Sequence, residues 1–558
     1  MRALVAALAL VAAPSCYKSL RTSPPDSGTS GSGGGGGAGL ADGAGGDDSG
    51  DGGLDNAPMA CDGASPPAAP QLRRPMRGAY TGSLHAPTAL ATLRPTFSWA
   101  AVAPTCGTTT YEVQADDSCA PGALDTCTFP SPELDAKGIA GLSYSPAADL
   151  KVATTPPVGA FYAWRVRACD ASTRCGSWSE VRYLHVGRVR EDINGDGYGD
   201  LLAPSSRGIE VYFGASQFDV SAPSITIPDH VGATPTFSGD VNGDGFGDFF
   251  TSTDYTPSSG QVPTIYFGAP TLTAPVTLLL TKTAGGPSTL IQTNSAGDLN
   301  GDGFADLIVQ WAYSITTPQT ELRIFFGNTV IANIPDLSIP GPYVNAYTLN
   351  HSGRVGDLNG DGFEDIALTA ISDGGSNGGL VQLFAGGPHP TATAVDIATN
   401  AATYQIESVG DVDRDGFDDA LIVLAGTNYA LYRGAATLPV SVAKTWTDTT
   451  TSAAAGGFDI DGDGFSDFLV GTNAAAPILY RGATTGPSAV LNGLSHLTGS
   501  SIVAFSDHDG DGRPDFIGMS SPFSYPSMQW AGSDGTTDPR AFIVRLPADV
   551  MLYGQLVR

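Results

Sequence analysis

An acidic motif of nine residues occurs seven times in this chain of 558 residues, and it constrains the fold more than any other feature. The copy Asp298–Asp306 reads Asp-Leu-Asn-Gly-Asp-Gly-Phe-Ala-Asp. Successive copies begin 48 to 59 residues apart, a spacing typical of β-propellers and solenoids. We call the copies loops one to seven and number the residues of each from position 1 to position 9. They occupy residues 192–200, 240–248, 298–306, 357–365, 411–419, 459–467 and 507–515.

The residue types at these positions predict a metal site in each loop. Oxygens at positions 1, 3 and 5 of a tight loop converge on one point, and Gly at position 6 allows the positive φ that turns the chain. The carbonyl of position 7 can then face inward, and Asp at position 9 closes the shell. Hard oxygen ligands without His or Cys favour Ca²⁺, with Mg²⁺ as the weaker alternative. We therefore expect about seven Ca²⁺ ions, one per repeat.

The predicted ligands are Asp192, Asn194, Asp196, Tyr198 and Asp200; Asp240, Asn242, Asp244, Phe246 and Asp248; Asp298, Asn300, Asp302, Phe304 and Asp306; Asp357, Asn359, Asp361, Phe363 and Asp365; Asp411, Asp413, Asp415, Phe417 and Asp419; Asp459, Asp461, Asp463, Phe465 and Asp467; and Asp507, Asp509, Asp511, Arg513 and Asp515. An EF-hand loop would need an acidic residue at position 12. That position is instead Ala203, Thr251, Val309, Leu368, Ile422, Val470 and Gly518 in the seven copies.

Short apolar strands follow the loops, as in Leu307–Val309, and each repeat then continues to an aromatic–Gly signal such as Phe326-Gly327. A fourth strand is predicted in residues 224–227, 276–279, 337–339 and 542–544. Four strands in about 50 residues make one propeller blade. The chain is therefore expected to be all-β, with a seven-bladed β-propeller over residues 188–558.

These repeats resemble the FG-GAP repeats, also called VCBS repeats, of the integrin alpha-subunit β-propeller. The resemblance implies that each acidic loop joins the first two strands of a blade and binds Ca²⁺ on one face of the ring. The chain departs from that pattern at a few positions. Glu191, Phe458 and Ser506 replace the Gly before the first Asp, Arg414 replaces the Gly of position 4, and Arg513-Pro514 alters loop seven.

Residues 75–187 show the alternation of a β-sandwich, with apolar residues at every second position in Phe97–Trp99 and Tyr162–Ala168. The pattern resembles a fibronectin type III domain through Trp99, Tyr111-x-Val113 and the run from 162 to 180. Trp99, Trp164 and Trp178 are predicted to pack in the core, and a sugar-binding platform is the less favoured interpretation.

The N-terminus predicts export. Residues 3–13 are apolar and precede Cys16, which resembles the acylated Cys of bacterial lipoproteins, so residues 1–16 are expected to form a signal peptide with a lipobox. Ordinary secretion is the alternative. Residues 17–74 are rich in Gly, Ser and Asp and predict a disordered tether. Together these features indicate an extracellular or cell-surface protein, anchored in the outer membrane as a lipoprotein.

Six cysteines remain after Cys16, and export makes disulfides the favoured interpretation over a zinc site. Sequence proximity favours Cys119–Cys127 and Cys169–Cys175, which leaves Cys61 and Cys106 as the third pair.

The composition limits the kinds of partner that the chain is expected to bind. The chain has 56 acidic and 27 basic residues and a net charge of −29, which argues against nucleic acid as a partner. No apolar run is long enough to span a membrane, so contact with one is expected only through the lipid anchor.

Two classes of function fit these features. The first is a non-catalytic surface protein that binds or adheres to a protein or glycan, with a calcium-stabilised propeller head on a flexible tether. The alternative is a secreted polysaccharide lyase or hydrolase built on a propeller. We favour the first because the seven histidines are scattered. In addition, Glu210, Glu321 and Glu407, which lie outside the loops, show no pairing in the sequence.

Overall fold

The computed structural model describes residues 65–529, apart from residues 206, 220–221, 229–234, 252–262, 273–276, 280–288, 313–319, 342–348, 372–378, 400–402, 425–427, 439–440, 448–450, 473–477, 491–499 and 521–525. All of the described residues belong to one compact unit, Met59–Arg558. The predicted signal peptide, Cys16, Cys61 and the strand expected at 542–544 lie outside the described residues. No helix in the part that the structure describes is long and apolar enough to cross a membrane.

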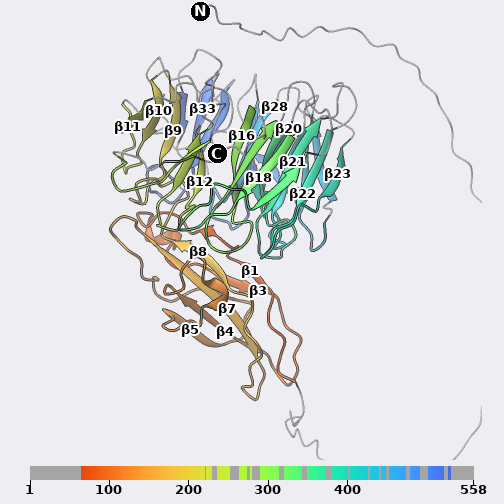
Figure 1. Cartoon of the computed structure of the whole chain (residues 1–558). Helices are drawn as coiled ribbons and strands as arrows, with labels where there is room; N and C mark the ends of the chain where they lie inside the picture. The colour runs from red at the N-terminus through yellow and green to blue at the C-terminus, as the bar shows by residue number, and fades with distance from the viewer. Residues whose placement is uncertain are drawn as a thin grey trace, which may run out of the picture. The chain divides into compact units, whose positions relative to one another are not determined.

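The described chain is all-β, as predicted. Its helices are two single turns of 3₁₀ helix, η1 (Thr88–Leu90) and η2 (Leu124–Thr126). Two groups of sheets are present, one between residues 72 and 186 and one between residues 201 and 529. Figure 1 shows the strands of the first group, including β4, β5 and β7, and the upright sheets of the second group, including β9, β16 and β22.

The first group is a β-sandwich of two sheets. The smaller sheet has the order β1 (Leu72–Arg74), β3 (Phe97–Trp99), β6 (Ser143–Tyr144). The larger has the order β2 (Ala79–Tyr80), β8 (Arg182–Val186), β7 (Ala160–Cys169), β4 (Thr110–Asp116), β5 (Leu134–Ile139). Alternate residues of β3, β4 and β7 point into one shared core, which explains the period of two in their sequences.

Trp99 and Trp164 are buried in this core, as predicted. The prediction for Trp178 is wrong, because its side chain is only half-buried and lies against two arginines. The guanidinium carbons of Arg165 and Arg167 are each 4.4 Å from the centroid of the Trp178 ring. The ring follows β7 in the chain and covers the polar face of that strand, where a π surface can stabilise the two cations.

The structure forms two of the predicted disulfides, Cys119–Cys127 and Cys169–Cys175. Cys106 is also disulfide-bonded. Disulfides of this kind persist in oxidising surroundings, so they fit an extracellular protein.

The second group consists of seven consecutive antiparallel sheets, each a simple meander in chain order. The first three are β9 (Leu201–Ser205), β10 (Gly208–Tyr212), β11 (Ile225–Ile227); β12 (Pro235–Gly239), β13 (Asp248–Thr251), β14 (Thr264–Tyr266), β15 (Thr277–Leu279); and β16 (Thr289–Gly297), β17 (Asp306–Ala312), β18 (Thr320–Phe325), β19 (Leu337–Pro340). The next two are β20 (Leu349–Gly356), β21 (Asp365–Ile371), β22 (Gly379–Phe384), β23 (Val395–Thr399); and β24 (Thr403–Gly410), β25 (Asp419–Leu424), β26 (Asn428–Arg433), β27 (Ser441–Thr447). The last two are β28 (Thr451–Phe458), β29 (Asp467–Thr472), β30 (Ile478–Arg481), β31 (Ser488–Val490); and β32 (Ser500–Ser506), β33 (Asp515–Ser520), β34 (Pro526–Gln529).

The strand that follows loop three is apolar on both faces because it lies between two neighbouring sheets. In β17, Leu307 and Val309 pack on the sheet of β13, where they join Phe250 in one cluster. Ile308 points the other way and joins Ile366 of β21 in another cluster. A strand that is covered on both faces reads as a continuous apolar run, which is the pattern observed in the sequence.

Backbone hydrogen bonds link neighbouring loops. In loops one, two, three, five and six the N–H of position 8 donates to the carbonyl of position 1 in the preceding loop, as in Gly247 to Asp192 at 2.7 Å. The residue after the aromatic–Gly signal donates to position 2 of the preceding loop, as in Ala269 to Ile193 at 3.0 Å. Both bonds also connect loop one to loop seven, through Gly199 to Asp507 and Ala215 to His508.

The junction between loops six and seven differs from the others. Position 8 of loop seven is Pro514, which has no N–H to donate. The side chain of Arg513 instead donates from Nη1 to the carbonyl of Ile460, at position 2 of loop six. The Arg-Pro departure noted in the sequence therefore changes how this loop joins its neighbour.

Candidate metal-binding loops

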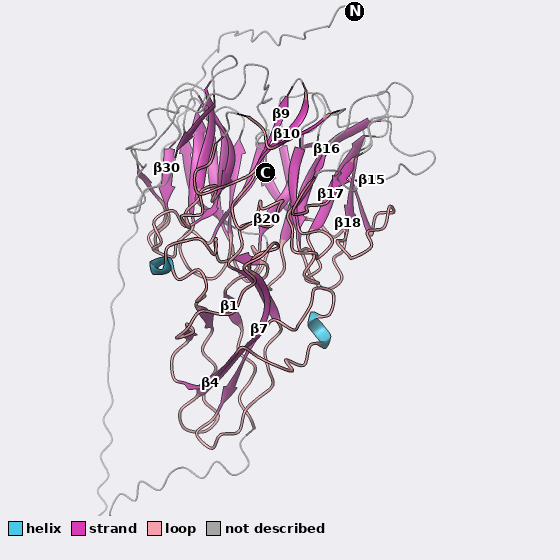
Figure 2. Cartoon of the chain, turned by 90° about the vertical axis from the view of Figure 1, so that its left-hand side faces the viewer, coloured by secondary structure: helices cyan, strands magenta, loops and turns pink. Residues whose placement is uncertain are grey.

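Loops two to seven connect the first two strands of their sheets, and loop one joins β8 to β9. In Figure 2 most of the described loops of the upright sheets, drawn in pink, gather at one end of the sheets. The loops share one internal frame of hydrogen bonds. In every loop the N–H of position 6 donates to the position-1 carboxylate at 2.6–3.0 Å. The N–H of position 7 donates to the position-5 carboxylate at 2.9–3.1 Å.

The Asp at position 9 joins the loop to the rest of its sheet. All seven of these residues are at most 1 % exposed. In loop three, Asp306 accepts the N–H of Leu299 at 2.8 Å and the N–H of Gly327 at 2.9 Å. The second donor is the Gly of the aromatic–Gly signal, which explains why loop and signal recur together. Each carboxylate oxygen keeps a further lone pair, so a structural role does not use up its capacity as a ligand.

Two backbone positions in each loop adopt positive φ. In loop one these are Gly195 with φ 72° and Gly197 with φ 92°, at positions 4 and 6. The position-4 Gly also has no room for a side chain, because a Cβ there would lie 2.5 Å from the Phe246 ring of the next loop. The aromatic at position 7 thus packs on the preceding loop, a role that the analysis of one repeat alone does not reveal.

Loop five shows how this packing adapts. Arg414 occupies position 4 with φ 59°, and its guanidinium carbon lies 5.2 Å from the centroid of the Phe465 ring in loop six. A cation–π contact here replaces the contact between glycine and an aromatic ring.

Positions 3 and 5 bring the remaining oxygens together in two ways. Where position 3 is Asn, as in loop one, the Nδ2 of Asn194 donates to the Asp196 carboxylate at 2.9 Å. Where position 3 is Asp, three carboxylates converge, with oxygens within 4.8 Å of one another. The converging sets are Asp411, Asp413 and Asp419; Asp459, Asp461 and Asp467; and Asp507, Asp509 and Asp511. An all-oxygen donor set of this kind fits Ca²⁺.

Burial makes these carboxylates costly to ionise. It raises the pKa of Asp192 to about 7, with the neighbouring Asp196 adding to the shift. Burial also raises the pKa of Asp507 to about 8, with Asp511 adding to it. The pKa of Asp200 is held well above its usual range by burial and then by the charge of Asp192. A bound cation would offset both causes, so the electrostatics of the loops also fit a metal ion.

Two arginines that the sequence analysis did not single out contact the loops. The Nη1 atom of Arg433 lies 2.8 Å from an oxygen of Asp413, and that of Arg481 lies 3.2 Å from an oxygen of Asp461. Both stand at the end of the third strand, directly before the aromatic–Gly glycine. An alignment of the seven repeats with one another would have revealed them, because arginine occurs there only in these two repeats.

The sandwich contacts the loops as well. The hydroxyl of Tyr183 donates to Asp298 at 2.7 Å, and Arg74 forms an ion pair with Asp411 at 2.6 Å. Other sandwich residues bond to loop carbonyls: Ser83 to Gly197, His85 to Asp196, Gly122 to Asp302, Arg77 to Gly362 and Arg73 to Asp415. The sequence analysis did not predict these contacts, which pair residues more than 100 positions apart.

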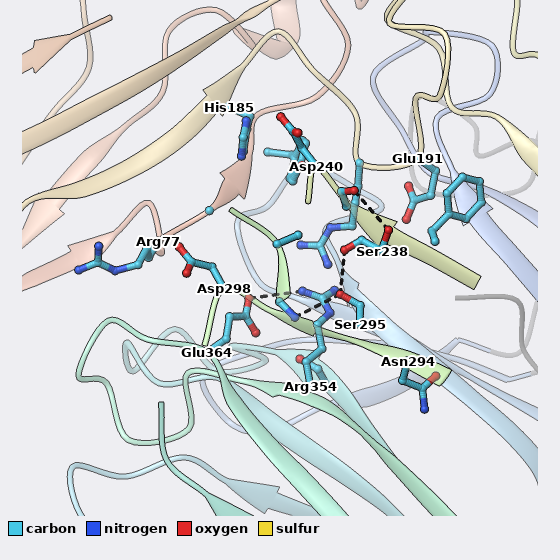
Figure 3. A pocket seen from close by; sticks show the side chains of 18 of the residues that line it. Arg77, His185, Glu191, Ser238, Asp240, Asn294, Ser295, Asp298, Arg354 and Glu364 are labelled. Atoms are coloured by element: carbon cyan, nitrogen blue, oxygen red, sulfur yellow. Dashed lines mark hydrogen bonds and ion pairs between the residues drawn. The ribbon is translucent and has the colours of Figure 1, made fainter. Parts of the chain in front are cut away.

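A cavity of about 200 Å³ lies next to these loops, lined by residues of the sandwich and of several sheets (Figure 3). Its wall includes Glu191, Glu364 and Glu407. The Nη1 of Arg354 lies 3.4 Å from Glu364, and Ser506 donates to Glu191 at 2.9 Å. The cavity is polar and charged, and His185 and His508 line it together with these acidic residues.

Comparisons with known proteins bear on the repeats. Two solved structures were found with similar folds, described as BBS1N in complex with ARL6DN, soaked with mercury and with lead. The first is 11% identical with a TM-score of 0.36, and the match covers 60% of this chain and 88% of that chain. The second is 12% identical with a TM-score of 0.35, and the match covers 59% of this chain and 87% of that chain. Residues 459–518, which include loops six and seven, match the model of the FG-GAP-like repeat.

Proposed function

We propose that this chain is a non-catalytic, calcium-stabilised binding protein of the cell surface or extracellular space. Its seven sheets would be the blades of one closed propeller, with one Ca²⁺ in each loop. The observation that supports the proposal is the hydrogen-bond frame shared by all seven loops, from position 6 to position 1 and from position 7 to position 5, together with the converging carboxylates of loops five to seven. The backbone bonds from loop one to loop seven support closure of the ring.

The metal would act mainly as a structural element. Each loop holds three or four carboxylates close together, and a divalent cation relieves their repulsion. At a free calcium concentration about tenfold above the Kd, each independent site would add ~1.4 kcal/mol, and seven would add ~10 kcal/mol. That sum is comparable with the whole net stability of a typical domain.

The ligand would bind at the end of the sheets away from the loops, or at the central cavity, because the sandwich already contacts the loop end. The strand connections at the other end differ in length, as expected for a variable binding surface. The connection between β13 and β14 spans residues 252–263, whereas that between β25 and β26 spans residues 425–427. We propose a protein or glycan as the ligand, displayed on a fibronectin type III-like spacer and a lipid-anchored tether.

Metal content tests the proposal directly. Purified protein is dialysed in calcium and then against metal-free buffer, and bound calcium is measured by elemental analysis. We expect about seven calcium ions per chain, and two or fewer would contradict loading of every repeat. A binding array of glycans and proteins, probed with the purified chain in calcium and in EDTA, then tests the ligand class.

The enzymatic alternative is tested at the cavity. Glu210 and Glu321 form ion pairs with Arg207 and Arg323 and are accounted for structurally. Glu364 is the acid to replace, because its Oε2 atom is buried without a hydrogen-bond partner and the residue lines the cavity. We expect no polysaccharide cleavage by the wild type. Calcium-dependent cleavage that Glu364→Gln abolishes would overturn the non-catalytic assignment.

A further inference from the structure

Repeats five and six differ from repeats one to four at two positions, whereas repeat seven differs from repeats five and six in lacking the arginine. The residue before the aromatic–Gly glycine is Phe213, Phe267, Phe326 and Ala385 in repeats one to four, Arg433 and Arg481 in repeats five and six, and Ala531 in repeat seven. Position 3 is Asn in loops one to four and Asp in loops five to seven. Arginine at the end of the third strand therefore occurs only where position 3 carries a charge.

The geometry explains this pairing. In loop five, Oδ1 of Asp413 accepts the N–H of position 5 at 3.3 Å, while Oδ2 faces the guanidinium of Arg433 at 2.8 Å. In loop six, Oδ1 of Asp461 accepts the same N–H at 3.2 Å, and Oδ2 faces Arg481 at 3.2 Å. One oxygen of each carboxylate remains on the loop side, and the other is held by the arginine.

In the Asn loops, both polar atoms of the position-3 side chain are hydrogen-bonded within the loop, without an arginine. The Oδ1 atom of Asn194 accepts the N–H of position 5 at 3.0 Å, and Nδ2 donates to the position-5 carboxylate at 2.9 Å. The same two bonds occur at Asn242, Asn300 and Asn359. An Asp at position 3 has no N–H₂ to donate, and in loops five and six a cation faces its second oxygen instead.

The Asn loops and the two arginine-paired Asp loops carry the same formal charge. Loops one to four carry three Asp at positions 1, 3, 5 and 9, giving a charge of −3. Loops five and six carry four Asp at these positions and one paired arginine, which also gives −3. Without the arginine, these two loops would hold one more unpaired negative charge than the Asn loops.

We propose that Arg433 and Arg481 are built-in counter-charges of loops five and six, which weaken calcium binding there and stabilise these loops when calcium is absent. The inference rests on the proposed function, because it presumes that the loops bind calcium. It divides the sites into an Asn class and an arginine-paired Asp class. Loops of the second class would stay folded at a lower free calcium concentration than the same loops would without the arginine.

Loop six is the better place to test this. Among the described residues we find no hydrogen bond or ion pair from the sandwich to loop six, whereas Arg74 contacts Asp411 in loop five. In Arg481→Ala we expect the thermal midpoint to fall in EDTA and to recover in saturating calcium. Removal of a unit positive charge beside the site should tighten calcium binding there by about tenfold. Competition with a chromophoric chelator measures this as a tighter first macroscopic binding step.

Arg167→Ala is the matched control. Its side chain is 30 % exposed and pairs with Glu112 of the sandwich, outside every loop, whereas the side chain of Arg481 is 27 % exposed. The control should change the midpoint equally in EDTA and in calcium and leave calcium affinity unchanged. The double variant Asp461→Asn with Arg481→Ala converts loop six to the Asn class and should restore affinity to within about twofold of the wild type.

The outcomes separate the two proposals. If the wild type binds no calcium, the proposed function itself fails. If the wild type binds calcium but Arg481→Ala binds it with unchanged or weaker affinity, or loses stability equally in both conditions, the counter-charge role is overturned while the proposed function stands.

Discussion

In the sandwich, one cluster of large side chains from both sheets fills a single core that includes Phe97, Trp99, Tyr162 and Trp164. In the seven sheets, the apolar clusters are smaller and lie between neighbours, and buried carboxylates bond to backbone at the edge of each sheet. The sandwich therefore depends on hydrophobic burial and disulfides, whereas the sheets also depend on groups whose charge must be balanced. The difference predicts that solution conditions will affect the two regions unequally.

Removal of calcium should have the largest effect. In EDTA we expect the transition of the sheets to move to much lower temperature, corresponding to ~10 kcal/mol for seven sites, because carboxylate repulsion is no longer offset. Scanning calorimetry, with near-ultraviolet circular dichroism of the sandwich tryptophans, distinguishes the two regions. An unchanged melting curve after EDTA treatment would remove the proposed difference between them.

The pH dependence without calcium should be the next largest effect. Burial raises the pKa of Asp298 and Asp467 to about 7 and that of Asp419 to about 8 in the folded protein. The folded state then retains protons that the unfolded state releases at about pH 4, so its stability is lost as the pH rises through about 7 to 8. We expect the midpoint in EDTA to fall between about pH 5 and about pH 8. Saturating calcium should abolish most of this fall, and a fall of equal size with calcium bound would mean that the metal does not act through these groups.

Trp164→Ala should destabilise the sandwich by ~3–5 kcal/mol, since it empties a fully buried site in the core. The loss should be the same in calcium and in EDTA, because no loop carboxylate is involved. Chemical denaturation in both conditions measures it. Trp178→Ala is the control, and the half-buried Trp178 should cost less.

Two aspartates of loop three should behave differently from each other. Asp302→Ala removes a position-5 ligand, so it should lower the thermal midpoint in calcium by the worth of one site, ~1–2 kcal/mol, and change little in EDTA. Asp306→Ala removes the acceptor of two backbone N–H groups as well as a position-9 ligand, so it should destabilise by ~2–4 kcal/mol in EDTA and by more in calcium. Equal losses for Asp302→Ala in both conditions would mean that this residue does not act through metal.

Tyr183→Phe should have the smallest effect, ~1 kcal/mol, because it removes one hydrogen bond to Asp298 while the ring remains packed. The residue belongs to the sandwich and its partner belongs to loop three, so a loss seen in the transition of the sheets would show that the two regions are coupled. The transitions of the sandwich and the sheets are compared by calorimetry, with wild type as the reference.

Much of the fold could be predicted because its signals are local. A continuous apolar run after each loop indicates a strand covered on both faces, and β17 is such a strand. The pairs Cys119–Cys127 and Cys169–Cys175 are close in sequence and form. The alternation in β3 and β7 correctly predicted the burial of Trp99 and Trp164.

The remaining features depend on contacts between distant parts of the chain. Trp178 shares the aromatic character of the core residues, but it faces Arg165 and Arg167 across the outer surface of the sheet. The contacts of Arg74 and Tyr183 with the loops connect separate sheets and leave no local pattern. The two hydrogen bonds of the position-9 Asp in loops one to six are likewise invisible until the third strand is placed beside the loop.

Pro514 has a consequence for how the sheets come apart. At most junctions, backbone N–H groups donate hydrogen bonds from one loop to its neighbour. Pro514 has no N–H to donate, and the side chain of Arg513 donates a hydrogen bond to loop six instead. A hydrogen bond from a side chain with rotatable bonds breaks more easily than one from a peptide group that is fixed in the backbone. We therefore expect amide exchange to be fastest beside residues 459–467 and 513–515, and the last repeat to detach there while the other six stay joined.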